Sequence, residues 1–247
     1  MSDKKVFIVV GSPRTGTSLM CAVLSDAGAD FGVSSESWNR TGGAFEHPIL
    51  VGSYKYLKRI VFLKKFSDTA VRKIEKKLSK NIHDLFEQVS FAKFPPLSHM
   101  LPYYIKKEGY DVTVILAYRR FEDFALSMLI KNPSSVKKLK EDYIDMYQTG
   151  LILLNIHGGC AISYDEIINE SETQWIDALA AATHLDRDKI ADARFTRNRK
   201  KIEGENKFYL HDPQCDSIYA ELNKYKGKAV AKNRSKITKE DKVEPKV

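Results

Sequence analysis

The chain has too few cysteines to be held together by disulfides. Its 247 residues contain three of them, Cys21, Cys160 and Cys215, which are far apart and odd in number. Small secreted scaffolds pair an even set of cysteines, and zinc sites bring two of them within a few positions of each other. The sequence therefore excludes a disulfide framework and a cysteine zinc site, and it predicts free thiols in a reducing compartment.

Long apolar segments are absent as well. No run approaches the roughly 18 apolar residues that a membrane-spanning helix needs. The opening MSDKKVFIVV lacks the apolar core and the small-residue cleavage site of a secretory signal. With 43% hydrophobic and 29% charged residues, the composition is that of a globular protein. We expect a cytoplasmic protein without a membrane span.

Acidic residues are outnumbered. The 40 Lys and Arg against 32 Asp and Glu give a formal net charge of +8. Part of the excess lies near the C-terminus, where lysines recur from Lys224 to Lys246 among few apolar residues. Such a segment buries too little apolar surface to fold by itself. We predict a single α/β domain over 1–227 and a disordered basic tail over 228–247. A role for this tail on nucleic acid or an anionic surface is the weaker alternative, and we expect no nucleic-acid partner.

The most informative segment is KVFIVVGSPRTGTS at residues 5–18. An apolar run ends at Gly11 and an apolar helical pattern follows, which predicts a strand, a glycine loop and a helix. Backbone N–H groups of such a loop form a cradle for phosphate oxygens. The spacing G-x-x-x-x-G-x-[ST] is that of a nucleotide P-loop, but Thr17 stands where a kinase or ATPase has its lysine. The positive charge is at Arg14 instead. The residues predicted to contact the phosphate are Ser12, Arg14, Thr15, Gly16, Thr17 and Ser18.

A phosphate loop with an early basic residue and no such lysine resembles the 5′-phosphosulfate loop of sulfotransferases, which use 3′-phosphoadenosine-5′-phosphosulfate (PAPS). The family's second signature has Arg after a strand, an acidic residue four positions later and Ser eight positions later. Residues 112–118 predict the strand, and Arg119, Asp123 and Ser127 follow at those spacings. The resemblance implies that Arg119 and Ser127 bind the 3′-phosphate, a fitting role for a guanidinium fork and a hydroxyl. Phe121 replaces the family's usual Pro, which removes no ligand.

Two weaker matches lie between these signatures. Residues 39–46, NRTGGAFE, look like a longer version of the N-x-x-G-[FW]-E segment of bacterial sulfotransferases, which implies that Glu46 is the general base. His47 is the alternative base because imidazole titrates near neutral pH. Glu46 as an ordinary acid at a helix N-terminus is the non-catalytic alternative. The sequence from Lys93 to Pro96 resembles K-x-P-[RK] with Pro96 in place of the basic residue, so Lys93 is either a catalytic cation or a solvent-exposed lysine.

The order of elements predicts the fold class. Apolar runs predict strands at 5–10, 90–94, 111–118 and 160–164. Helical periodicity covers 16–28, 48–64, 69–88, 97–107, 121–130, 136–156, 172–183, 186–193 and 213–225. Strands that alternate with helices indicate an α/β protein with a parallel sheet. We expect a P-loop-like parallel sheet flanked by helices, the sulfotransferase fold. Gly11, Lys93 and Arg119 should lie at the carboxyl ends of strands, where open parallel sheets bind ligands.

The resemblance implies sulfuryl transfer from PAPS to a hydroxyl or amine, with 3′-phosphoadenosine-5′-phosphate (PAP) as the product and no metal. By analogy with phosphoryl transfer, Arg14 and Lys93 stabilise the charge of the leaving and transferring groups. Glu46 or His47 takes the proton of the acceptor.

Several questions stay open at this level. The late basic residues Arg197 and Arg199 are candidates for closing the cofactor site. The acceptor is a small molecule, a glycan or a lipid, and the oligomeric state is unknown. The alternatives to an active sulfotransferase are a degenerate PAP- or nucleotide-binding protein without activity and an atypical P-loop kinase.

Overall fold

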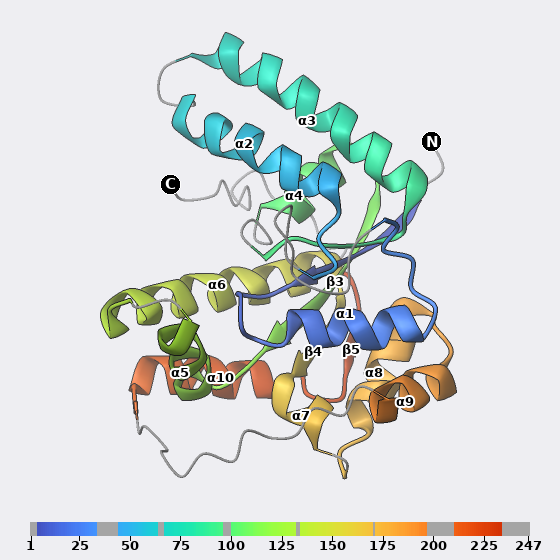
Figure 1. The fold of residues 1–247 in the computed structure, drawn as a ribbon, viewed down its shortest axis with the longest axis vertical. Helices are drawn as coiled ribbons and strands as arrows, with labels where there is room; N and C mark the ends of the chain where they lie inside the picture. Colours follow the sequence, from blue (N-terminus) through green and yellow to red (C-terminus); the bar gives the residue numbers. More distant parts are fainter. Residues whose placement is uncertain are drawn as a thin grey trace.

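The computed structural model describes residues 4–33, 44–63, 67–95, 100–131, 134–169, 171–196 and 210–233. Within these ranges five strands form one mostly parallel sheet, and helices flank it on both faces (Figure 1). The predicted α/β class with a parallel sheet between helices is therefore confirmed. None of the helices in these ranges is long and apolar enough to cross a membrane.

The sheet has the strand order β2-β1-β3-β4-β5. Its strands are β1 (Lys5–Val10), β2 (Phe91–Lys93), β3 (Asp111–Tyr118), β4 (Gly159–Ser163) and β5 (Ala229–Val230). The first four are parallel, with β1 between β2 and β3, and β5 pairs antiparallel with β4. The chain thus leaves β1 toward one neighbour, β2, and later enters β3 on its other side. The carboxyl ends of β1, β2 and β3 consequently lie side by side at a point where parallel sheets commonly bind ligands.

The helices follow the predicted order with small shifts at their ends. They are α1 (Thr17–Asp26), α2 (Pro48–Leu63), α3 (Asp68–Gln88), α4 (Leu101–Lys107), α5 (Phe121–Lys131), α6 (Val136–His157), α7 (Tyr164–Ile168), α8 (Gln174–Thr183), α9 (Arg187–Thr196) and α10 (Pro213–Asn223). Side-chain caps explain several of the starts. Ser67 accepts a bond from the N–H of Ala70 at 3.3 Å, and Ser135 accepts one from Lys138 at 3.2 Å. Each cap satisfies an N–H group that the helix itself leaves unpaired.

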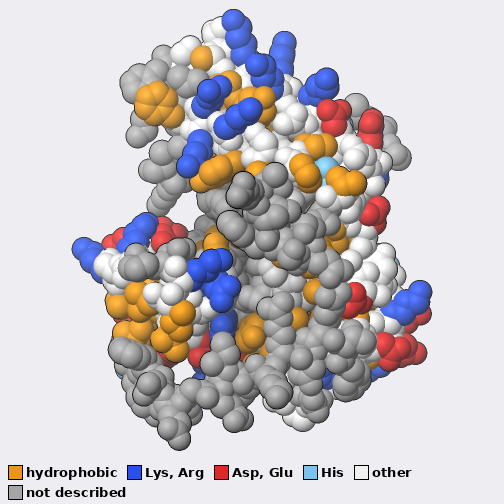
Figure 2. Space-filling view, in the orientation of Figure 1, with side chains coloured by type: hydrophobic (Ala, Val, Ile, Leu, Met, Phe, Trp, Pro, Cys, Tyr) orange, Lys and Arg blue, Asp and Glu red, His pale blue; other side chains and the backbone are white. Residues whose placement is uncertain are grey.

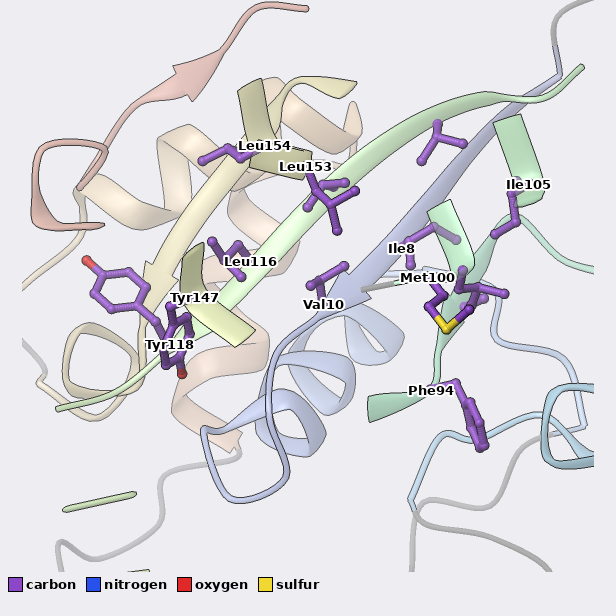
Figure 3. Packing of buried hydrophobic residues seen from close by; sticks show 14 of the residues in the cluster. Ile8, Val10, Phe94, Met100, Ile105, Leu116, Tyr118, Tyr147, Leu153 and Leu154 are labelled. Carbon is purple, nitrogen blue, oxygen red and sulfur yellow. The ribbon is translucent and has the colours of Figure 1, made fainter. Parts of the chain in front are cut away.

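The strands are apolar on both faces because helices cover both. Along β1, the side chains of Val6, Ile8 and Val10 belong to one buried cluster, whereas Phe7 and Val9 belong to another. Figure 3 shows the first cluster, in which Leu153 and Leu154 of α6 approach the sheet. Helices α1, α8 and α9 contribute to the second. Each such side chain contributes about 1.5–3 kcal/mol to the free energy of unfolding when fully buried.

One strand was not predicted. Ala229 and Val230, assigned above to the basic tail, form β5 at the edge of the sheet. Lys232 follows it and forms an ion pair with Asp111 at the start of β3. A two-residue edge strand is held by backbone hydrogen bonds to its neighbour, so no apolar pattern in the sequence predicts it. The described structure therefore continues past residue 227 to Asn233, and residues 234–247 lie outside the described residues.

We expect the free energy of unfolding to depend on pH through His157, the last residue of α6. Its side chain is buried, and its pKa is lowered to about 4, chiefly by this burial. The positive charges of Lys106 and Lys232 contribute to the lowering of the pKa, whereas the negative charge of Asp111 opposes it. The unfolded chain takes up this proton near pH 6.5, so folding opposes protonation. We therefore expect the free energy of unfolding to decrease by about 3 kcal/mol in all as the pH falls from 6.5 to about 4.

Chemical denaturation at successive pH values measures this effect. The variant His157→Gln should flatten the slope of stability against pH over this range, because it removes the titrating ring. The control is His211→Gln, since the His211 side chain is 76% exposed. Equal slopes for the wild type and His157→Gln would contradict the assignment.

Candidate functional site

The loop between β1 and α1 has an unusual backbone. Gly16 has a φ of 93°, and an added Cβ would lie 2.7 Å from Cδ2 of Tyr164, so only glycine fits there. Arg14 has a φ of 72°, a left-handed conformation that L-residues seldom adopt. The hydroxyl of Thr15 donates to the carbonyl of Ser12 at 2.7 Å and closes the turn. Because Gly16 has no side chain, α1 starts without a side-chain cap, which leaves its first N–H groups available to an anion.

The two sequence signatures are in direct contact. The Nε of Arg14 in the loop donates to the Oγ of Ser127 on α5 at 2.9 Å, across 113 positions of sequence. Arg14 is exposed and Ser127 is partly buried. Ser127 therefore faces the loop.

Arg119 stacks on the tyrosine that packs against the loop. Its guanidinium carbon is 4.3 Å from the ring centroid of Tyr164, the first residue of α7, which packs against Gly16. Its Nε is buried and has no hydrogen-bond partner among the described residues. A buried donor without a partner costs about 1–3 kcal/mol, so the site is well suited to an acceptor such as a phosphate oxygen. The next residue, Arg120, instead approaches Asp165 at 4.0 Å and Tyr219 at 5.7 Å.

Two tyrosines on α6 hold the backbone that leads to Arg119. The hydroxyl of Tyr143 donates to the carbonyl of Arg119 at 2.9 Å, and that of Tyr147 donates to Ala117 at 3.4 Å. Both rings are buried and lie edge to face with centroids 4.6 Å apart. The end of β3 is thereby fixed by two rigid side chains, which positions Arg119.

Lys93 is a buried cation, and the reading of it as a solvent-exposed lysine is wrong. Its side chain is 2% exposed at the end of β2, and its Nζ donates to the Oγ of Ser18 at 3.0 Å and to the carbonyl of Ala44 at 2.6 Å. The carboxylate of Glu46 lies 3.8 Å from the same nitrogen. Burial lowers the pKa of Lys93, and the nearby Cys21 and Glu46 oppose that shift. Lys93 thus ties the first turn of α1 to the segment that carries the candidate base.

The two candidate bases have different surroundings. The Glu46 side chain is 12% exposed and faces Lys93. His47 is buried, and its Nδ1 accepts the N–H of Ile49 at 3.3 Å, which caps the start of α2. An added Cβ on Gly32 would come within 3.3 Å of the His47 ring, so the ring packs beneath that loop. Burial lowers the pKa of His47, opposed by Asp30. Of the two, Glu46 is the one linked to the glycine loop.

Some predicted residues are not placed. Arg197 and Arg199, proposed to close the cofactor site, lie outside the described residues, as does Pro96. The first part of the segment 39–46 lies outside them too, so the structure describes that segment only from Ala44 onward. The remaining loop residues are described, with Ser12, Thr15 and Thr17 buried and Ser18 partly exposed.

No protein-family model, curated protein or solved structure matches this chain. The function is therefore inferred from the chemistry of the site. Three cations meet around one loop. Arg14 belongs to it, Arg119 lies over the tyrosine that packs on it, and Lys93 donates to Ser18 in the first turn of the helix that follows it. Across the described residues, no group of three or more His, Cys, Asp or Glu side chains could hold a metal ion.

Sequence reasoning did not single out Tyr164 as a site residue. The local signal for its position is the capping box of α7, in which Ser163 and Glu166 bond each other's backbone N–H groups. This box starts α7 directly at the end of β4 and sets Tyr164 beside the loop. The spacing S-x-x-E is visible in the sequence, but the contact with Arg119, 45 positions away, is not.

Proposed function

We propose that the protein is a sulfotransferase that moves a sulfuryl group from PAPS to a hydroxyl or amine of an acceptor. The observation that carries the proposal is the contact between the two signatures, the Arg14 to Ser127 hydrogen bond of 2.9 Å. This contact supports the proposal because Ser127, assigned to the second phosphate, lies against the loop assigned to the first. An ordinary nucleoside diphosphate or triphosphate has its phosphates in one chain, whereas PAPS has them on two different positions of the ribose.

The unpaired Nε of Arg119 supports the second phosphate site. A buried guanidinium nitrogen without a partner is costly unless a ligand supplies the acceptor. In this proposal Arg119 and Ser127 hold the 3′-phosphate, while the loop N–H groups and Arg14 hold the 5′-phosphosulfate. When bound, PAPS supplies the sulfuryl group and a phosphate leaving group.

The chain's own residues then have defined tasks. The Lys93 ammonium lies beside Ser18 and stabilises negative charge at the start of α1. Glu46 takes the proton of the acceptor, with its carboxylate held near Lys93. Thr17 in the place of the usual P-loop lysine argues against a kinase, because no long cationic side chain of the loop helix reaches a terminal phosphate.

Isothermal titration with PAP, AMP and ADP tests the cofactor. We expect PAP to bind more tightly than AMP, because without a 3′-phosphate Arg119 stays unpaired. The variant Arg119→Ala should weaken PAP binding about 10- to 100-fold and leave AMP binding nearly unchanged. The matched control is Arg120→Ala, which removes the neighbouring guanidinium that pairs elsewhere.

Equal affinities of the wild type for PAP and AMP would contradict the assignment of the 3′-phosphate site. Tighter binding of ATP or ADP than of PAP would favour the kinase alternative. Where PAP binds, transfer from labelled PAPS to a panel of hydroxyl and amine acceptors distinguishes an active enzyme from a binding protein.

A further inference from the structure

A large share of the positive charge of the chain lies in one helical hairpin. Residues 48–80 carry a net charge of +8, and the basic C-terminal segment 224–247 is the other strongly basic part of the sequence. Ten Lys and Arg stand against two acids in this range: Lys55, Lys58, Arg59, Lys64, Lys65, Arg72, Lys73, Lys76, Lys77 and Lys80 against Asp68 and Glu75. Figure 2 shows Lys and Arg side chains gathered over α2 and α3, with hydrophobic side chains among them.

The basic residues of α3 share one exposed face. Arg72, Lys73, Lys76, Lys77 and Lys80 are all exposed and recur at the three- and four-residue spacing of a helix face. The opposite face packs into the core through Leu78, Ile82, Leu85 and Phe86. Glu75 is the acid that lies among these residues in the sequence, and it pairs with Lys107 of α4 at 3.1 Å. It therefore leaves the positive charge of the basic face uncompensated.

Helix α2 adds an exposed aromatic ring to this surface. Lys55, Lys58 and Arg59 are exposed, and Phe62, at the helical spacing that continues their face, is 66% exposed. Phe62 stands near the C-terminal end of α2, which lies at the upper left of Figure 1, away from the sheet. Lys58 also stands over the ring of Tyr54 at 4.4 Å. We call the surface formed by Lys55, Lys58, Arg59 and Phe62 of α2 and the five basic residues of α3 the basic hairpin face.

We propose that the basic hairpin face docks on the surface of an anionic lipid bilayer. Helices that lie in a membrane interface combine Lys and Arg with Phe, Trp or Leu, and each cation near an anionic leaflet adds to the affinity. Two helices side by side present a broad surface that matches a planar array of charges better than a single polyanionic chain. Phe62 enters the boundary between headgroups and acyl chains, while the lysines contact the headgroups. This docking is independent of the proposed sulfotransferase activity.

Flotation of the full-length protein with lipid vesicles tests the proposal. We expect binding to phosphatidylcholine vesicles that contain about 30% phosphatidylserine and little binding to pure phosphatidylcholine. Raising the salt from roughly 0.1 M to 0.5 M should weaken the binding, because surface charges are then screened. PAP titration of the same samples should be unchanged, which separates this surface from the cofactor site.

Two variants test which residues carry the binding. Lys73→Gln, Lys76→Gln and Lys77→Gln together should weaken vesicle binding on the order of a hundredfold. The matched control replaces Lys137, Lys189 and Lys228, which are exposed outside the hairpin, and should bind as the wild type does. Phe62→Ser should weaken binding several-fold at both salt concentrations, because it removes apolar rather than charged contact.

Three outcomes would overturn the proposal. One is the absence of binding to the anionic vesicles at low salt. Another is equal loss in the hairpin variant and in its matched control. The third is stronger binding to RNA or heparin than to vesicles together with no effect of Phe62→Ser, which would assign the face to a polyanionic chain. Thermal melting of each variant confirms that the fold is retained.

Discussion

Glu46→Gln is expected to lower kcat ~10²–10⁴-fold, the usual contribution of a general base, while PAP binds with nearly wild-type affinity. The side chain keeps its shape but loses the carboxylate that accepts the proton. The cofactor contacts proposed for Arg14, Arg119 and Ser127 do not involve Glu46, which explains why binding should survive. Single-turnover transfer from labelled PAPS and PAP titration measure the two quantities separately.

His47→Asn is the matched control for this experiment. His47 caps α2 through its Nδ1, and an asparagine oxygen can serve the same N–H group of Ile49. We therefore expect a small change in melting temperature and little change in kcat. A large loss of kcat for His47→Asn, with a nearly normal Glu46→Gln, would reverse the assignment of the base.

Much of the fold could be predicted from the sequence because its elements have strong local signals. Buried parallel strands read as short apolar runs, and the caps at Ser67, Ser135 and Asp212 set helix starts within a residue or so of the predicted positions. β5 had no such signal, because its two residues join the sheet through backbone bonds at an edge. The sheet therefore includes Ala229 and Val230, which the sequence assigns to the basic tail.

The sequence pointed to the residues of the candidate site but not to their contacts. The spacing of the two signatures pointed to Arg14, Arg119 and Ser127, and these lie around the loop between β1 and α1. The stacking of Arg119 on Tyr164 joins segments that only the sheet brings together. The binding of PAPS at this site stays a prediction.

Lys93 illustrates why burial is difficult to predict for a single charged residue. A lysine at the end of a short strand is usually exposed, and an isolated buried ammonium is costly. Here the cost is offset by two hydrogen bonds and by Glu46 at 3.8 Å, and these partners come from α1 and from the segment before α2. Such an arrangement links the first turn of α1 to the candidate base through one atom.

Lys93→Met is accordingly expected to lower kcat about 10²–10³-fold, comparable to the loss of one preorganised donor from an active site. Methionine fills a similar volume at the end of β2 but leaves the Ala44 carbonyl and the Glu46 carboxylate without their cation. We expect a loss of about 1–3 kcal/mol in the free energy of unfolding as well, because those groups remain partly buried. Chemical denaturation and single-turnover kinetics measure both effects.

The double variant Lys93→Met with Glu46→Gln separates a catalytic link from a purely structural one. If the two side chains act as a pair, the second substitution adds little to the loss of kcat caused by the first, and the losses of stability are also less than additive. Fully additive losses of kcat would mean that Lys93 and Glu46 act independently. A Lys93→Met protein that keeps wild-type kcat despite its lower stability would make Lys93 a structural residue and would remove it from the proposed mechanism.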